Sequence, residues 1–106
     1  MLKKSQRLSR DHFKNLGRAP GFFHSEHFLL RATDSPLGPR VGISVSKKVA
    51  KAAHLRNRTR RRAYAAVADL IPSLSKKLYL IAAKPGALSL KGDELKRELA
   101  ELLKKG

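Results

Sequence analysis

The sequence predicts a single small domain of the α/β or α+β class, with one mixed central sheet packed by helices. The chain has 106 residues, the size of one compact domain, and 42% of them are hydrophobic, enough for one modest core. Segments with the two-residue period of strands alternate with segments of helical period. Their order is α-β-β-α-β-α, with room for one further short strand. We therefore expect residues 1–106 to form one domain.

The first half of the chain is expected to hold a short helix and two strands. Ser9 is a suitable N-cap and Gly17 a suitable residue just past a helix end, which leaves residues 10–16 as about two turns. Residues 27–32 indicate a strand. Residues 41–46 alternate between a β-branched face and a small, polar face that consists of Gly42, Ser44 and Ser46. That second face can lie under another element or stay open to a ligand.

The second half predicts a long helix, a buried strand and a final helix. Residues 52–70 form the long helix, since their apolar residues share a stripe about 120° wide, made of Leu55, Thr59, Ala63, Ala66, Val67 and Leu70. Residues 78–83 are continuously apolar, which is typical of a buried strand. Residues 91–104 form the last helix, whose inward positions are Leu95, Leu99, Leu102 and Leu103.

The charge balance points to a polyanionic partner. Lys and Arg number 24 against 8 Asp and Glu, which gives a formal charge of +16. Such a charge repels itself in the folded state, so nucleic acid is the first candidate partner and an anionic membrane the second. The longest apolar runs are six residues, far short of a membrane span. With no secretory signal and no cysteine, we expect a cytoplasmic protein without membrane association or an obligate protein partner.

The positive charge is concentrated in one stretch. Residues 35–68 contain no acidic residue and nine basic ones. Eight of these run from the end of the strand at 41–46 into the long helix: Lys47, Lys48, Lys51, Arg56, Arg58, Arg60, Arg61 and Arg62. A merely solvated helix face mixes both signs, so a binding surface is the favoured interpretation. An arginine fork holds a phosphate through two hydrogen bonds and stacks on a base, and Asn57 can bond a base edge or a 2′-hydroxyl.

The segment SVSKKVAKAAHLRNRTRRR resembles the central signature of the bacterial ribonuclease P protein family. That signature has a strand ending in Ser-Lys-Lys and a helix opening with Arg-Asn-Arg-x-Lys/Arg-Arg, here residues 46–48 and 56–61. The link between them is one residue longer than the commonest family spacing, and Ala50 stands where Gly is usual. Weaker matches extend over nearly the whole chain: Phe13, the region 23–28, the apolar strand before Lys84-Pro85-Gly86 and the leucine-rich last helix.

The resemblance implies a ribonucleoprotein in which a large RNA, using Mg²⁺, removes the 5′ leader from precursor tRNA and the protein assists. It also implies a left-handed βαβ crossover. The residues that would bind the RNA subunit are Lys47, Lys48, Lys51, Arg56, Asn57, Arg58, Arg60, Arg61 and Arg62. The residues that would bind the leader are Phe13, Ser44 and Ser46, although Phe13 fits a core position equally well.

A nuclease activity of the protein itself is not favoured. His24 and His27 stand three residues apart in an expected strand and would point to opposite faces, and no carboxylate cluster suits two metals. We predict no catalytic residue, no metal site and no cofactor bound by the protein. Two alternatives stay open: a ribosomal or ribosome-assembly protein that binds rRNA, and a helix-turn-helix module that binds DNA.

Overall fold

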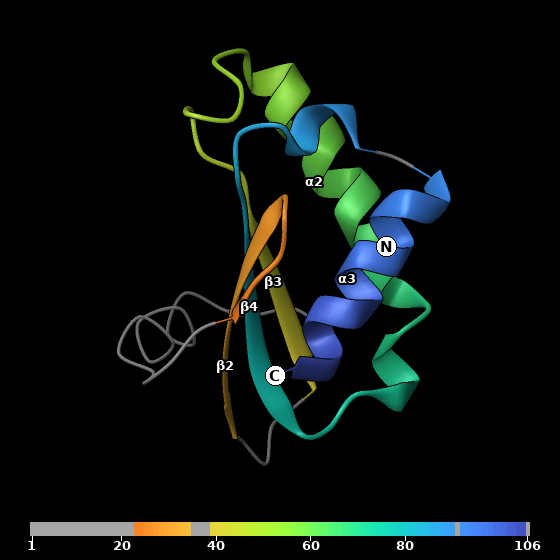
Figure 1. Cartoon of the computed structure of the whole chain (residues 1–106). Helices are drawn as coiled ribbons and strands as arrows, with labels where there is room; N and C mark the ends of the chain where they lie inside the picture. The colour runs from red at the N-terminus through yellow and green to blue at the C-terminus, as the bar shows by residue number, and fades with distance from the viewer. Residues whose placement is uncertain (1–22, 35–38, 91, 106) are drawn as a thin grey trace.

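The computed structural model describes residues 23–34, 39–90 and 92–105 (Figure 1). The strands are β1 (Phe23–His24), β2 (Phe28–Asp34), β3 (Arg40–Ser44) and β4 (Lys77–Ala83). The helices are α2 (Ala53–Ala68) and α3 (Gly92–Lys105), with short 3-10 helices η2 (Ile71–Ser73) and η3 (Ala87–Ser89). The helix expected at residues 10–16 lies outside the described residues, as does Phe13. Within the described part, no helix is long and apolar enough to cross a membrane.

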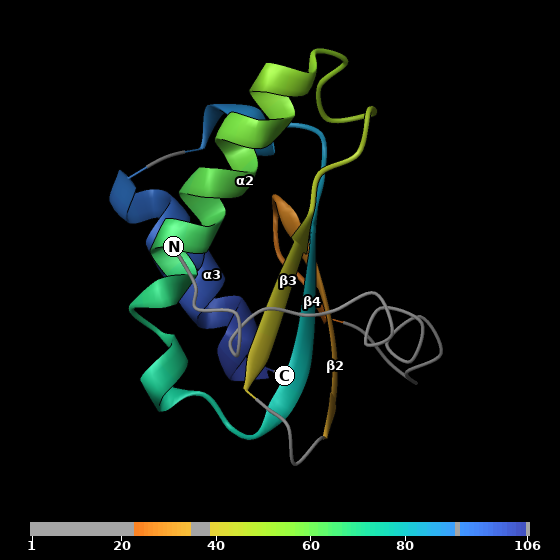
Figure 2. The same cartoon turned by 180° about the vertical axis from the view of Figure 1, so that it is seen from behind.

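The four strands form one mixed sheet in the order β1-β2-β4-β3. β1 pairs antiparallel with β2 and β2 antiparallel with β4, whereas β3 runs parallel to β4. The parallel pair requires a crossover, and α2 lies within it. Both α2 and α3 pack on the same face of the sheet, as the two opposite views show (Figures 1 and 2). From β1 onward this is the predicted class and element order, with β1 as the extra short strand. The handedness of the crossover stays a prediction.

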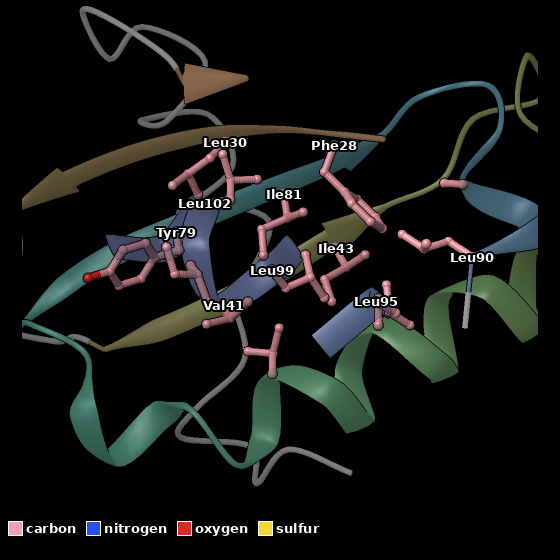
Figure 3. Close-up of a cluster of buried hydrophobic side chains, with 14 of the residues drawn as sticks. Phe28, Leu30, Val41, Ile43, Tyr79, Ile81, Leu90, Leu95, Leu99 and Leu102 are labelled. Carbon is pink, nitrogen blue, oxygen red and sulfur yellow. The ribbon is translucent and has the colours of Figure 1, made fainter. Parts of the chain in front are cut away.

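The core lies between the sheet and the two helices (Figure 3). Leu30 pairs with Ile81 across β2 and β4, and Ile43 pairs with Ile81 across β3 and β4, so these side chains share the face toward the helices. All four inward leucines of α3 are buried, and α2 buries Thr59, Ala63 and Val67, as the helical periods predicted. Each fully buried leucine or isoleucine stabilises the fold by about 1.5–3 kcal/mol, so this core fixes the sheet and both helices relative to one another.

The opposite face of the sheet, which we call the second face, carries the alternate residues of each strand. One registered row crosses all four strands: His24, Leu29, Ala82 and Ser44. Gly42 and Ser44 therefore lie on the second face of β3, as the alternation predicted. The strand itself ends at Ser44, so Ser46 belongs to the loop that follows rather than to β3. Ser44 and Ser46 are both exposed.

Candidate nucleic-acid interface

A compact loop carries the three lysines of the basic stretch. The N–H of Val49 donates to the carbonyl of Ser46 at 3.1 Å, which closes a turn directly after β3. The Ala50 side chain is buried and Val49 packs against the core. These apolar contacts hold the loop against the protein, while its exposed charged side chains are Lys47, Lys48 and Lys51. The loop therefore presents its positive charge to solvent.

The Arg56 side chain bonds the protein's own backbone. Its Nη1 donates to the carbonyl oxygens of Ala50 at 3.0 Å and Lys51 at 2.7 Å. Helical side chains lean toward the helix N-terminus, so a residue in the first turn of α2 reaches the preceding loop. The sequence assigned Arg56 to the RNA-binding set together with its neighbours, but in the structure it is half-buried and hydrogen-bonded to the loop.

The outer face of α2 has the basic character that the helical period predicted. Asn57, Arg58 and Arg61 are exposed, while Arg60 and Arg62 are half-buried at the border of the apolar stripe. The helix has no acidic residue in its first turn and no side-chain N-cap. The first acid after it is Asp69, whose carboxylate pairs with Lys96 on α3 at 3.0 Å. The exposed arginines therefore face solvent with no carboxylate on their own helix to neutralise them.

A hollow of about 240 Å³ on α2 is lined by Asn57, Arg60, Arg61 and Tyr64. Residues 57, 61 and 64 are spaced i, i+4 and i+7, which places them on one helix face. The hydroxyl of Tyr64 accepts a hydrogen bond from the backbone N–H of Ile43 at 3.1 Å, which fixes the ring between α2 and β3. Tyr64 was assigned no role from the sequence. The i, i+4 and i+7 spacing is the signal that could have grouped Tyr64 with Asn57 and Arg61.

A second polar network joins the β1–β2 turn to α3. Glu98 Oε2 accepts hydrogen bonds from the Ser25 hydroxyl at 2.6 Å and from the His27 N–H at 2.8 Å. Glu98 Oε1 lies 2.7 Å from His27 Nδ1. Burial raises the pKa of Glu98, but the hydrogen bonds from His27 and Ser25 outweigh it, so the pKa lies below its ordinary value. Lys84 Nζ completes the network by donating to the Ser25 carbonyl at 2.8 Å.

This network corrects one sequence expectation and adds one group of residues that the sequence did not indicate. His24 and His27 do not share one strand, because a turn at residues 25–27 separates β1 from β2, so the argument that they point to opposite faces of a strand was wrong. The fold also brings together Glu26, His27 and Glu98, whose candidate ligand atoms lie within 4.8 Å of one another. Both oxygens of Glu98 already interact with Ser25 and His27, so this donor set fits a structural network better than a metal centre.

Comparison with known proteins identifies the family. The family model described as Ribonuclease P matches residues 2–106. The chain is 36% identical over 89 residues to a ribonuclease P protein component from Microcystis aeruginosa, covering 78% of this chain and 74% of that protein. It is 32% identical over 107 residues to the corresponding component from Pediococcus pentosaceus, covering 97% and 89%. A solved mutant of the Staphylococcus aureus RNase P protein superposes with a TM-score of 0.85 at 22% identity, covering 96% and 88%.

The fold and the exposed basic residues thus define the class: a small, single-sheet α+β protein with a basic surface suited to a polyanion. The chain belongs to the ribonuclease P protein family. Its members are the protein component of an endoribonuclease, and the function of the family is tRNA 5′ processing together with an RNA subunit. Membership decides against the ribosomal and helix-turn-helix alternatives and confirms the resemblance seen in the central signature.

Proposed function

We propose that this protein grips the ribonuclease P RNA with the loop after β3 and the outer face of α2, and holds the 5′ leader of precursor tRNA on the second face of the sheet. The observation that carries the first part is the exposure of Lys47, Lys48, Lys51, Arg58 and Arg61 in a stretch without any acid. Each such cation can neutralise one phosphate and release its counterion, which is the main source of affinity for RNA.

The hollow on α2 supports contact with unpaired nucleotides as well as with phosphates. Asn57 offers an amide that can bond a base edge, and the Tyr64 ring is held in place by its hydrogen bond to Ile43. The neighbouring arginines can take the phosphate of the same nucleotide. Aromatic rings and arginine planes stack on unpaired bases without regard to their identity, so this hollow suits a non-specific contact.

For the leader, the support is the character of the second face near the end of β3. Ser44 is exposed there, and its neighbour across the sheet is the small side chain of Ala82, whereas Gly42, two residues earlier on β3, is buried. A single strand can approach a backbone closely where side chains are small, and hydroxyls such as those of Ser44 and Ser46 can bond phosphate oxygens. Phe13, assigned to the same role by resemblance, lies outside the described residues.

Under this proposal the RNA subunit, with its Mg²⁺, breaks the bond, and the protein works by binding in the cytoplasm. Among the described residues, His27 is the histidine that lies in a group with carboxylates, and its Nδ1 is 2.7 Å from Glu98 Oε1. Because this pair links the β1–β2 turn to α3, it supports a structural role for His27. The protein screens the repulsion between the two polyanionic RNAs. Without the protein, dissolved cations must provide that screening.

Reconstitution tests the proposal. Purified protein is mixed with the ribonuclease P RNA of the same organism, and cleavage of precursor tRNA is followed across a Mg²⁺ titration. We expect no cleavage by protein alone and a lower Mg²⁺ requirement for the RNA when protein is present. An Arg58→Ala/Arg61→Ala variant should lose most of this effect. Cleavage by protein alone, or an unchanged Mg²⁺ requirement, would refute the proposal.

A further inference from the structure

We infer that Arg56 is a positioning residue. It holds the conformation of the loop at residues 46–51, which carries the three lysines, and is not a phosphate contact like Arg58 and Arg61. The inference rests on the proposed RNA interface and concerns how that interface is built. Its basis is the pair of hydrogen bonds from a single guanidinium nitrogen, Nη1, to two successive carbonyls, those of Ala50 and Lys51, at 3.0 and 2.7 Å.

Burial separates Arg56 from the exposed arginines of the motif. Arg58 and Arg61 are exposed, whereas Arg56 is half-buried against the loop. A charged donor that already satisfies two carbonyl oxygens loses those bonds if it turns outward to a phosphate, and charge-assisted bonds are the stronger kind. Arg56 is therefore retained by the loop while the exposed pair remains available to RNA.

The second half of the loop depends on this partner. α2 begins after Ala52, which makes no side-chain cap, and the first turn holds no acid. The turn at 46–49 is closed by the Val49 N–H, and Ala50 is buried, but the carbonyls of Ala50 and Lys51 find their bonds at Arg56. The bond to the Ala50 carbonyl is partly buried, and a carbonyl withdrawn from water requires such a partner, whereas the bond to the Lys51 carbonyl is exposed.

The consequence for RNA is electrostatic. Carbonyl oxygens carry partial negative charge and would repel phosphates if they faced the RNA. With the Ala50 and Lys51 carbonyls turned to Arg56, the loop presents lysine side chains instead. Arg56 thereby acts through Lys47, Lys48 and Lys51, and its importance depends on those three lysines being present.

A double-mutant cycle tests this dependence. Arg56→Lys keeps the charge but replaces the planar fork, and it is measured alone and in a Lys47→Ala/Lys48→Ala/Lys51→Ala background. Arg58→Lys is the matched control. We expect Arg56→Lys alone to weaken binding to the ribonuclease P RNA by roughly tenfold, the loss of one charge-assisted bond. In the triple-alanine background it should add almost nothing, since residues that act through one another are non-additive.

Hydrogen exchange of the free protein provides a readout that does not depend on RNA. Arg56→Lys should accelerate exchange of the Val49 and Ala50 amides and leave α3 unchanged, while Arg58→Lys alters neither. If exchange behaves so but no variant affects RNA binding, the proposed interface is wrong and the loop role stands. If Arg56→Lys weakens binding equally in both backgrounds, or exchange is unaffected, Arg56 does not position the loop and the inference is overturned.

Discussion

The hydroxyl of Tyr64 on α2 and the backbone N–H of Ile43 on β3 form a 3.1 Å hydrogen bond that ties the basic helix to the edge of the sheet. β3 is the last strand in the order β1-β2-β4-β3, so one side of it has no strand neighbour among the described residues. A side chain from α2 supplies the partner that a further strand would otherwise give. This bond sets how the arginine face of α2 is oriented relative to the second face of the sheet.

Removing that hydroxyl should lower stability measurably. Tyr64→Phe keeps the ring but leaves the Ile43 N–H without its acceptor, which costs about 1–3 kcal/mol of unfolding free energy. Urea unfolding followed by circular dichroism measures the change. Tyr79→Phe is the matched control, because the Tyr79 hydroxyl makes only a long 3.4 Å bond to the Ser75 carbonyl. A loss at Tyr64 no larger than the loss at Tyr79 would contradict the role given to this bond.

Arg58 and Arg61, on the exposed face of α2, should each neutralise one RNA phosphate. In Arg58→Ala/Arg61→Ala, the slope of log K against log salt for the ribonuclease P RNA should flatten by roughly 1.5, since each contact contributes about 0.7–0.9. Filter binding between low and high salt gives the slope. Arg97→Ala/Lys104→Ala removes the same charge from exposed positions of α3 and should leave the slope nearly unchanged. Equal flattening by both variants would show that net charge, not the α2 face, binds the RNA.

A bulky residue on the second face of the sheet should weaken binding of the 5′ leader without weakening binding of mature tRNA. Ser44→Leu places a branched chain at an exposed position beside Ala82, where we propose that the leader lies. With reconstituted holoenzyme, affinity for precursor tRNA should fall by roughly tenfold, the value of about one lost base contact, while affinity for mature tRNA is retained. Ser75→Leu, an exposed serine before the opposite end of β4, is the control. An equal loss for both RNAs would exclude a leader-specific role for Ser44.

Acid should weaken the fold through Glu98. Hydrogen bonds from His27 and Ser25 outweigh burial and hold its pKa below the ordinary 4.5. A carboxyl with a depressed folded-state pKa gives stability that is present above its unfolded pKa and lost as pH falls through the folded value. The unfolding free energy should therefore fall below about pH 4.5, and Glu98→Gln should remove part of that dependence. Glu101→Gln, exposed on the same helix, should not; identical acid profiles for all three proteins would refute this.

Local patterns along the chain predicted the elements and the family. The helical period of α3 identified all four of its buried leucines, and the stripe on α2 identified Thr59, Ala63 and Val67. These predictions succeed because burial on one side of a helix or strand imposes a period that the sequence records directly. The Ser-Lys-Lys and Arg-Asn-Arg motifs of the basic stretch indicated the family from the residues alone, since RNA contacts require particular side chains at particular spacings.

Contacts between distant residues were decided only in three dimensions. Glu98 meets His27 across 71 positions, and the sequence showed the acid as one more surface charge on a helix. Tyr64 meets Ile43 across 21 positions, and Arg56 turns back to Ala50 although Asn57 and Arg58 face solvent. A helix period gives the face on which a residue lies, but the partner at that face depends on how strands and helices pack. The sequence alone thus indicated the residues that we propose to bind RNA, and the packing determined which of them are exposed.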